Sequence, residues 1–144
     1  MITLTYHQEI NAPAEKVWDV LWNKETYPVW TRPFSEVSTM TSDWKVGGQT
    51  SFTDGKNNGM LSTILSMNQP NEIIFKHLGE LKDGKPTLFH EGDSFEGSLE
   101  KYILTEHNGV TQLTVSVDTL PQYKEMMDNG FNSGLQVVKQ LSEK

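Results

Sequence analysis

The 144-residue sequence contains no cysteine and a single arginine. The absence of cysteine excludes disulfide bonds and thiolate chemistry. Acidic side chains outnumber basic ones by 19 to 12, which gives a formal net charge of −7. Nucleic acids and anionic membrane surfaces need concentrated positive charge on their protein partners, so we expect neither as a partner.

Long apolar runs are also missing, and from the first residues we expect no signal peptide. No apolar stretch approaches the length of a membrane span, so we expect no insertion into a membrane. The first residues lack the basic segment and apolar block of a secretory signal peptide. Together with the absence of cysteine, this predicts a cytoplasmic protein. The length suits one domain, residues 1–144, and no repeat or linker divides it.

The chain begins with a strand that changes abruptly into a helix. Apolar and polar residues alternate up to Ile10, which is typical of a half-buried strand. The apolar spacing then becomes four residues, for example from Val17 to Leu21, and this predicts a helix over Pro13–Trp22. A second short helical turn is expected over Lys24–Trp30.

The middle of the chain predicts about six antiparallel strands. Turn residues rich in Gly, Asn, Asp and Pro separate apolar, β-leaning segments. Between Gly79 and Gly92 the pattern leaves a choice between a short strand and a loop. The predicted strands are Glu36–Met40, Gln49–Thr53, Met60–Met67, Glu72–Leu78, Ser94–Glu106 and Val110–Asp118.

The last two of these strands meet at the hairpin turn His107–Gly109. In the strand after the turn, every second residue from Leu113 to Val117 is apolar, so these residues share one face. In the strand before it, Phe95, Leu99 and Ile103 follow one another at intervals of four. We therefore expect these three residues to share a face.

The end of the chain predicts a long amphipathic helix. Apolar residues recur every three or four positions from Pro121 to about Ser142. Gly130 and Gly134 inside this helix each cost about 1 kcal/mol relative to alanine, which indicates close packing or open space at these positions. A twisted antiparallel sheet can wrap around such a helix and leave a pocket between the two.

Four motifs occur in order along the chain: Ile10–Trp18 (INAPAEKVW), Trp44–Gly48, the paired segments Gly59–Ile64 and Pro70–Phe75, and Asn129–Leu141. Together they resemble the SRPBCC superfamily of START-like proteins, and within it the AHSA-type branch of heat-shock chaperone ATPase activator homologues. The resemblance covers nearly the whole chain. It implies an α+β helix-grip fold, in which a twisted antiparallel sheet of about six to seven strands wraps around a long C-terminal helix, with two short helices after the first strand.

The same resemblance suggests three functions. The superfamily holds lipid carriers, hormone receptors and aromatase/cyclases, so our first hypothesis is a small-molecule-binding protein. It would hold an apolar or amphipathic ligand between sheet and helix without a cofactor and without catalysis. The alternatives are an enzyme of the polyketide-cyclase type that uses the same cavity, and a chaperone-interacting ATPase-activator homologue. We rank the chaperone partner last because the chain is the bare domain, and the branch's frequent dimers imply a homodimer.

Aromatic and methionine side chains are the candidates for the cavity wall, because they adapt to flat or apolar ligands. Packing in the core is the simpler role for each of them. Arg32 could bind a carboxylate or phosphate of a ligand, although a solvated surface position is its simpler role. His77 could place a titratable group in the pocket. The ligand-binding candidates are Trp30, Arg32, Phe34, Phe52, Phe75, His77, Phe95, Met127 and Phe131.

Catalytic and metal sites have weaker support. His77 is the one candidate general acid or base, with Asp93 or Glu96 as its partner, but no spacing demands this role. The only local groups of potential metal ligands are His77 with Glu80 and the segment His90–Asp93. Neither has a recognised zinc spacing, so we expect no metal site.

Overall fold

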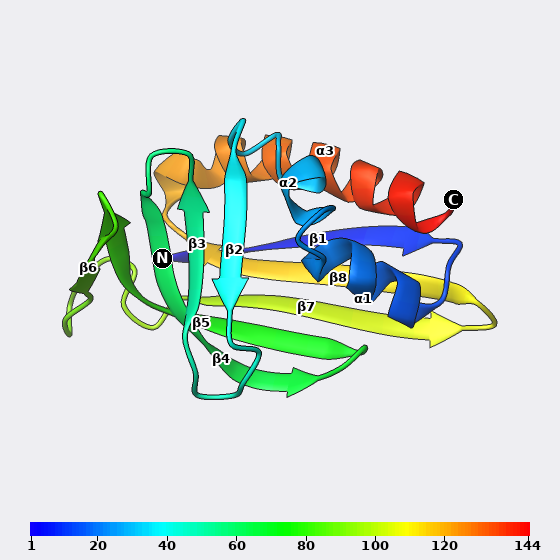
Figure 1. Cartoon of the computed structure of the whole chain (residues 1–144), viewed down its shortest axis with the longest axis horizontal. Coiled ribbons are helices and arrows are strands. Elements are labelled where there is room, and N and C mark those ends of the chain that lie inside the picture. The colour runs from blue at the N-terminus through cyan, green and yellow to red at the C-terminus, as the bar shows by residue number, and fades with distance from the viewer.

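The computed structural model describes the whole chain, residues 1–144, as a curled antiparallel sheet with three α-helices that pack on one another (Figure 1). The strand order is β1-β8-β7-β5-β4-β3-β2, and β6 pairs with the end of β5. In Figure 1 the strands β2 and β3 cross the direction of β1, β8 and β7, while α3 runs along β1. The elements are β1 (Ile2–Ile10), α1 (Ala14–Trp22), α2 (Tyr27–Trp30), β2 (Ser38–Ser42), β3 (Thr50–Asp54), β4 (Gly59–Asn68), β5 (Glu72–Lys82), β6 (Lys85–Leu88), β7 (Leu99–His107), β8 (Val110–Thr119), the 3₁₀ turn η1 (Pro121–Tyr123) and α3 (Lys124–Ser142).

The predicted helix-grip architecture is confirmed, with eight strands instead of six to seven. The additional strand is β6, which lies in the segment where the pattern left strand and loop both open. It pairs with the second half of β5, and β5 extends to Lys82 rather than ending at Leu78. None of the helices is both long enough and apolar enough to cross a membrane.

The phase predicted for β7 is wrong. Ile103 is 39% exposed, whereas Tyr102 and Leu104 are buried. The hairpin places Tyr102 opposite Val115 and Leu104 opposite Leu113. Residues that oppose one another across two strands share a face, so the apolar face of β8 decides which side chains of β7 point inward.

A cluster of aromatic rings joins α1 and α2 to the sheet. The ring of Trp22 lies edge-on to Phe75 and Tyr102, with centroid distances of 5.5 and 4.8 Å. The indole N–H of Trp30 donates a hydrogen bond to the carbonyl of Leu21 at 3.0 Å. These contacts anchor both short helices, and α1 packs beside α3.

The two glycines of α3 lie where the helix approaches its neighbours most closely. A Cβ atom at Gly134 would lie 2.6 Å from the carbonyl oxygen of Trp30, and one at Gly130 would overlap the ring of Phe34. Close packing is therefore the reason for both glycines. The backbone oxygen of Trp30 cannot move aside as a flexible side chain could.

Replacement Gly134→Ala tests this contact. Alanine favours a helix by about 1 kcal/mol relative to glycine. We nevertheless expect the free energy of unfolding, measured by urea denaturation, to fall by about 1–3 kcal/mol because of the overlap with Trp30. The matched control Ser133→Ala, at an exposed position of the same helix, should change it by less than about 0.5 kcal/mol. Stabilisation by Gly134→Ala would contradict the close approach.

Candidate functional site

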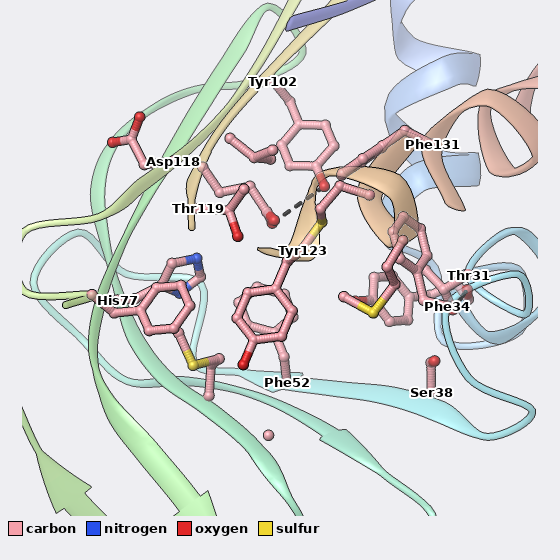
Figure 2. A pocket seen from close by; sticks show the side chains of 18 of the residues that line it. Thr31, Phe34, Ser38, Phe52, His77, Tyr102, Asp118, Thr119, Tyr123 and Phe131 are labelled. Atoms are coloured by element: carbon pink, nitrogen blue, oxygen red, sulfur yellow. Dashed lines mark hydrogen bonds between the residues drawn. The ribbon is translucent and has the colours of Figure 1, made fainter. Parts of the chain in front are cut away.

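A cavity of about 400 Å³ lies between the first half of α3, the segment around α2 and the sheet (Figure 2). Twelve of its twenty lining residues are hydrophobic. The second half of α3 and the helix α1 cover the rest of the sheet, where Val17, Leu21 and Val138 are fully buried. The cavity is thus the part of the space between sheet and helix that side chains leave unfilled.

Most of the candidates taken from the sequence line this cavity, and two do not. Arg32 is exposed and lies outside the lining. Phe75 is fully buried in the core, where its ring lies edge-on to Phe52 at a centroid distance of 5.2 Å. The candidates that line the cavity are Trp30, Phe34, Phe52, His77, Phe95, Met127 and Phe131.

Ring contacts hold several of these side chains in place. Phe131 stacks on Tyr6 at 4.9 Å and meets Phe34 edge-on at 4.9 Å. Phe95 lies in the turn before β7, not in the strand itself, and stacks on Tyr123 at 6.0 Å. Aromatic and methionine side chains form most of the apolar wall, and Met127 is one of these methionines.

Glu100 on β7 is a carboxyl group that faces this largely apolar cavity. The hydroxyl of Tyr102 donates a hydrogen bond to its Oε2 atom at 3.2 Å (dashed line in Figure 2). Burial disfavours the charged form and raises the pKa of Glu100 from 4.5 to about 7, although the hydrogen bond from Tyr102 acts in the opposite direction. Glu100 therefore changes its charge near neutral pH.

Glu100 is not among the residues predicted from the sequence, although the sequence contains a signal for it. The hairpin turn at His107–Gly109 pairs His107 with Val110, and counting back from this pair places Glu100 opposite Val117. Val117 belongs to the clearly apolar face of β8. Glu100 therefore had to share a face with Val117, and the apparent phase of Phe95, Leu99 and Ile103 hid this relation.

His77 lies in the cavity wall as a neutral imidazole. Its Nδ1 atom is hydrogen-bonded to the hydroxyl of Ser62 at 2.7 Å. Burial lowers the pKa of His77 from 6.5 to about 4, and the nearby carboxylate of Asp118 offsets only part of this effect. Its suggested partners, Asp93 and Glu96, do not line the cavity.

The other charged groups of the cavity are acidic. Asp118 accepts hydrogen bonds from the hydroxyl of Thr3 at 2.7 Å and from the backbone N–H of Leu99 at 3.0 Å. Glu80 is exposed. No lysine or arginine lines the cavity, and no three histidine or carboxylate side chains of the chain lie close enough together to hold a metal ion.

A family model described as Activator of Hsp90 ATPase homolog 1-like protein matches residues 11–143. The chain belongs to this family. The resemblance of its four motifs to the AHSA-type branch is thereby confirmed. No match was found among curated proteins.

Solved structures share the fold of this family member at low sequence identity. The Aha1 dimer from Colwellia psychrerythraea, solved in solution, has a TM-score of 0.74 at 13% identity, over 99% of this chain and 97% of that one. Protein CV1439 from Chromobacterium violaceum reaches 0.71 at 17% identity, over 100% and 99%. Protein MLL2253 from Mesorhizobium loti reaches 0.70 at 16% identity, over 97% and 96%. At these identities the likeness shows the fold alone.

The raised pKa of Glu100 predicts an unusual dependence of the protein's stability on pH. Between pH 4.5 and 7 the folded protein keeps Glu100 protonated while the unfolded chain loses this proton. The contribution of Glu100 to stability is therefore fully present below pH 4.5 and is lost as pH rises through 7. Replacement Glu100→Gln keeps an acceptor for Tyr102 without the charge.

We expect Glu100→Gln to have a larger free energy of unfolding than the parent protein at pH 8, by an amount on the order of 3 kcal/mol, and a similar one at pH 4. Urea denaturation at the two pH values measures both. Glu80→Gln, which removes an exposed carboxyl group, should change stability by less than about 0.5 kcal/mol at either pH. An equal effect of Glu100→Gln at pH 4 and pH 8 would show that Glu100 keeps an ordinary pKa.

Proposed function

We propose that the protein binds an apolar or amphipathic small molecule in the cavity beneath α3. The observation that carries this proposal is a cavity of about 400 Å³ whose lining is mostly hydrophobic. Small-molecule sites typically occupy about 300–1,000 Å³ and combine apolar walls with a few polar groups. Each square ångström of apolar surface that such a ligand buries contributes about 25 cal/mol.

The proposed binding residues divide into an apolar wall and a polar end. Phe34, Met127 and Phe131 form the wall on the side of the helices, and Glu100 and His77 supply polar groups on the side of the sheet. Polar groups at fixed positions would set the orientation of the ligand, whereas the apolar wall would supply most of the affinity. Arg32 and Phe75 receive no role, because neither lines the cavity.

Filling the cavity tests the proposal. The probe is N-phenyl-1-naphthylamine, an uncharged dye whose fluorescence rises in apolar surroundings. We expect it to bind with one molecule per chain. Met127→Trp places a larger side chain in the cavity and should weaken binding by about tenfold or more, which equals about 1.4 kcal/mol. Asn132→Trp, on the exposed face of the same helix, is the control and should leave binding unchanged.

Equal binding by Met127→Trp, Asn132→Trp and the parent protein would mean that the dye binds elsewhere on the surface. The absence of dye binding to the parent protein would oppose the proposed function itself. Far-ultraviolet circular dichroism of each variant establishes that it is folded before its binding is compared.

A second candidate function, catalysis of the polyketide-cyclase type, is favoured by Glu100. A general base is most useful when its pKa lies close to the working pH, and Glu100 has a pKa of about 7. Its carboxylate would remove a proton from a carbon atom beside a ketone. The hydroxyl of Tyr27, which also lines the cavity, would donate a hydrogen bond to the ketone oxygen, because the hydroxyl of Tyr102 already donates to Glu100. Solvent would return a proton to the carbon atom.

Hydrogen exchange of a simple ketone tests this chemistry. We expect the methyl protons of 2-acetylnaphthalene to exchange with deuterium oxide faster in the presence of the protein, as followed by proton NMR. The rate should rise as pH increases through about 7, and Glu100→Gln should reduce the added rate by at least about 100-fold. The control Glu125→Gln, at an exposed position outside the lining, should keep the full rate. If exchange is no faster than in buffer, the hypothesis of catalysis is rejected and the binding function is unaffected.

The remaining hypotheses rest on the family and its structures. The family name supports interaction with a chaperone, which we still rank last because the cavity offers a more direct function. The Aha1 structure from Colwellia psychrerythraea is a dimer, which supports the expectation of a homodimer for this chain.

A further inference from the structure

The charges in the cavity restrict the class of ligand. Glu80, Glu100 and Asp118 line the cavity, whereas no lysine or arginine does. The single arginine, Arg32, is exposed outside the lining. The carboxylate or phosphate of a ligand would therefore meet acidic groups without a compensating cation, and like charges at short distance repel one another.

Glu100 is the acidic group of the lining that is best placed to accept a hydrogen bond from a ligand. Asp118 already accepts two hydrogen bonds, and Glu80 is exposed. Glu100 is half-buried, and its Oε2 atom accepts one hydrogen bond from the hydroxyl of Tyr102. No protein group donates to its Oε1 atom, which is open to the cavity. A donor group of a ligand can therefore reach this oxygen directly.

We propose that the ligand is an amphipathic amine whose protonated nitrogen donates hydrogen bonds to Glu100 while its apolar part lies against α3. This inference rests on the proposed function. A charged N–H donor forms stronger hydrogen bonds with a carboxylate than a neutral donor does. The rings of Tyr27 and Tyr102 belong to the same region of the lining, and aromatic faces attract ammonium groups.

Among Glu100 and the groups that surround it, only Glu100 is expected to change its charge near neutral pH and so alter the affinity for an amine. Tyr102 from β7 and Tyr27 from α2 stay uncharged, because burial raises the pKa of both hydroxyls above their usual value. His77 from β5 is also uncharged, because burial lowers its pKa. The other ionisable residues of the lining are Glu80, Asp118 and Tyr123.

Three ligands of equal chain length test the inference: octylamine, octanol and octanoate. Isothermal titration calorimetry at pH 8 should show that octylamine binds at least about tenfold more tightly than octanol, and that octanoate binds most weakly. The affinity for octylamine should rise between pH 6 and pH 8, as Glu100 loses its proton, while the affinity for octanol stays constant.

Two variants separate the cavity carboxyl from the general negative charge of the protein. Glu100→Gln should bind octylamine and octanol equally, whereas Glu125→Gln, at an exposed position of α3 outside the lining, should keep the preference for the amine. Both remove one negative charge, so non-specific attraction of a cation to the acidic surface would weaken equally in the two. Loss of the preference in Glu100→Gln alone would support pairing with Glu100.

The outcomes distinguish this inference from the proposed function. If octanoate binds as tightly as octylamine, or if Glu100→Gln keeps the preference, the amine is excluded while a binding cavity stands. Binding of N-phenyl-1-naphthylamine without binding of octylamine would also exclude the amine. If the parent protein binds neither the dye nor any of the three octyl compounds, the proposed function fails together with the inference.

Discussion

The register between β7 and β8 determines which side chains reach the interior. It sets Tyr102 opposite Val115 and Glu100 opposite Val117. A slip by one residue would turn Lys101 and Ile103 inward and would remove both Tyr102 and Glu100 from the inner face. The aromatic packing of Trp22 on Tyr102 and the acidic character of the cavity therefore depend on the same pairing.

Two titratable groups of the cavity respond to pH in opposite directions. The folded protein lowers the pKa of His77 from 6.5 to about 4, so its contribution to stability is present above pH 6.5 and is lost as pH falls through 4. It raises the pKa of Glu100 from 4.5 to about 7, so that contribution is present below pH 4.5 and is lost as pH rises through 7. Across the shared range the two effects offset one another. The sum of the two contributions to the free energy of unfolding therefore changes less with pH in this range than either contribution alone.

The sequence predicted the fold well because the fold depends on patterns along the chain. Alternating residues up to Ile10 and the three-to-four-residue repeat of α3 each mark an element that has one buried face. The same patterns do not distinguish core from cavity wall. Phe75 and His77 share a face of β5, but Trp22 covers Phe75 and leaves His77 to line the cavity. This difference depends on where the end of α1 packs on the sheet. The pattern of apolar residues along β5 contains no information about that position.

Glu100 was harder to predict from the sequence, because the partner strand β8 determines which face of β7 it occupies. The neighbouring apolar residues Leu99 and Ile103 indicate the opposite face when β7 is considered by itself. The pairing of Glu100 with Val117 shows instead that Glu100 lies on the inner face. Predicting such a residue requires both strands of a hairpin to be considered together, starting from the strand with the clearer alternation.

The contact between Gly130 and Phe34 links the size of the cavity to the packing of the helices. Phe34 lines the cavity and also fills the space that a side chain at position 130 would need. A larger residue there would push the ring of Phe34 away from α3, and the volume open to a ligand would change with it. The volume of the cavity is consequently governed in part by a residue that has no side chain of its own and does not line the cavity.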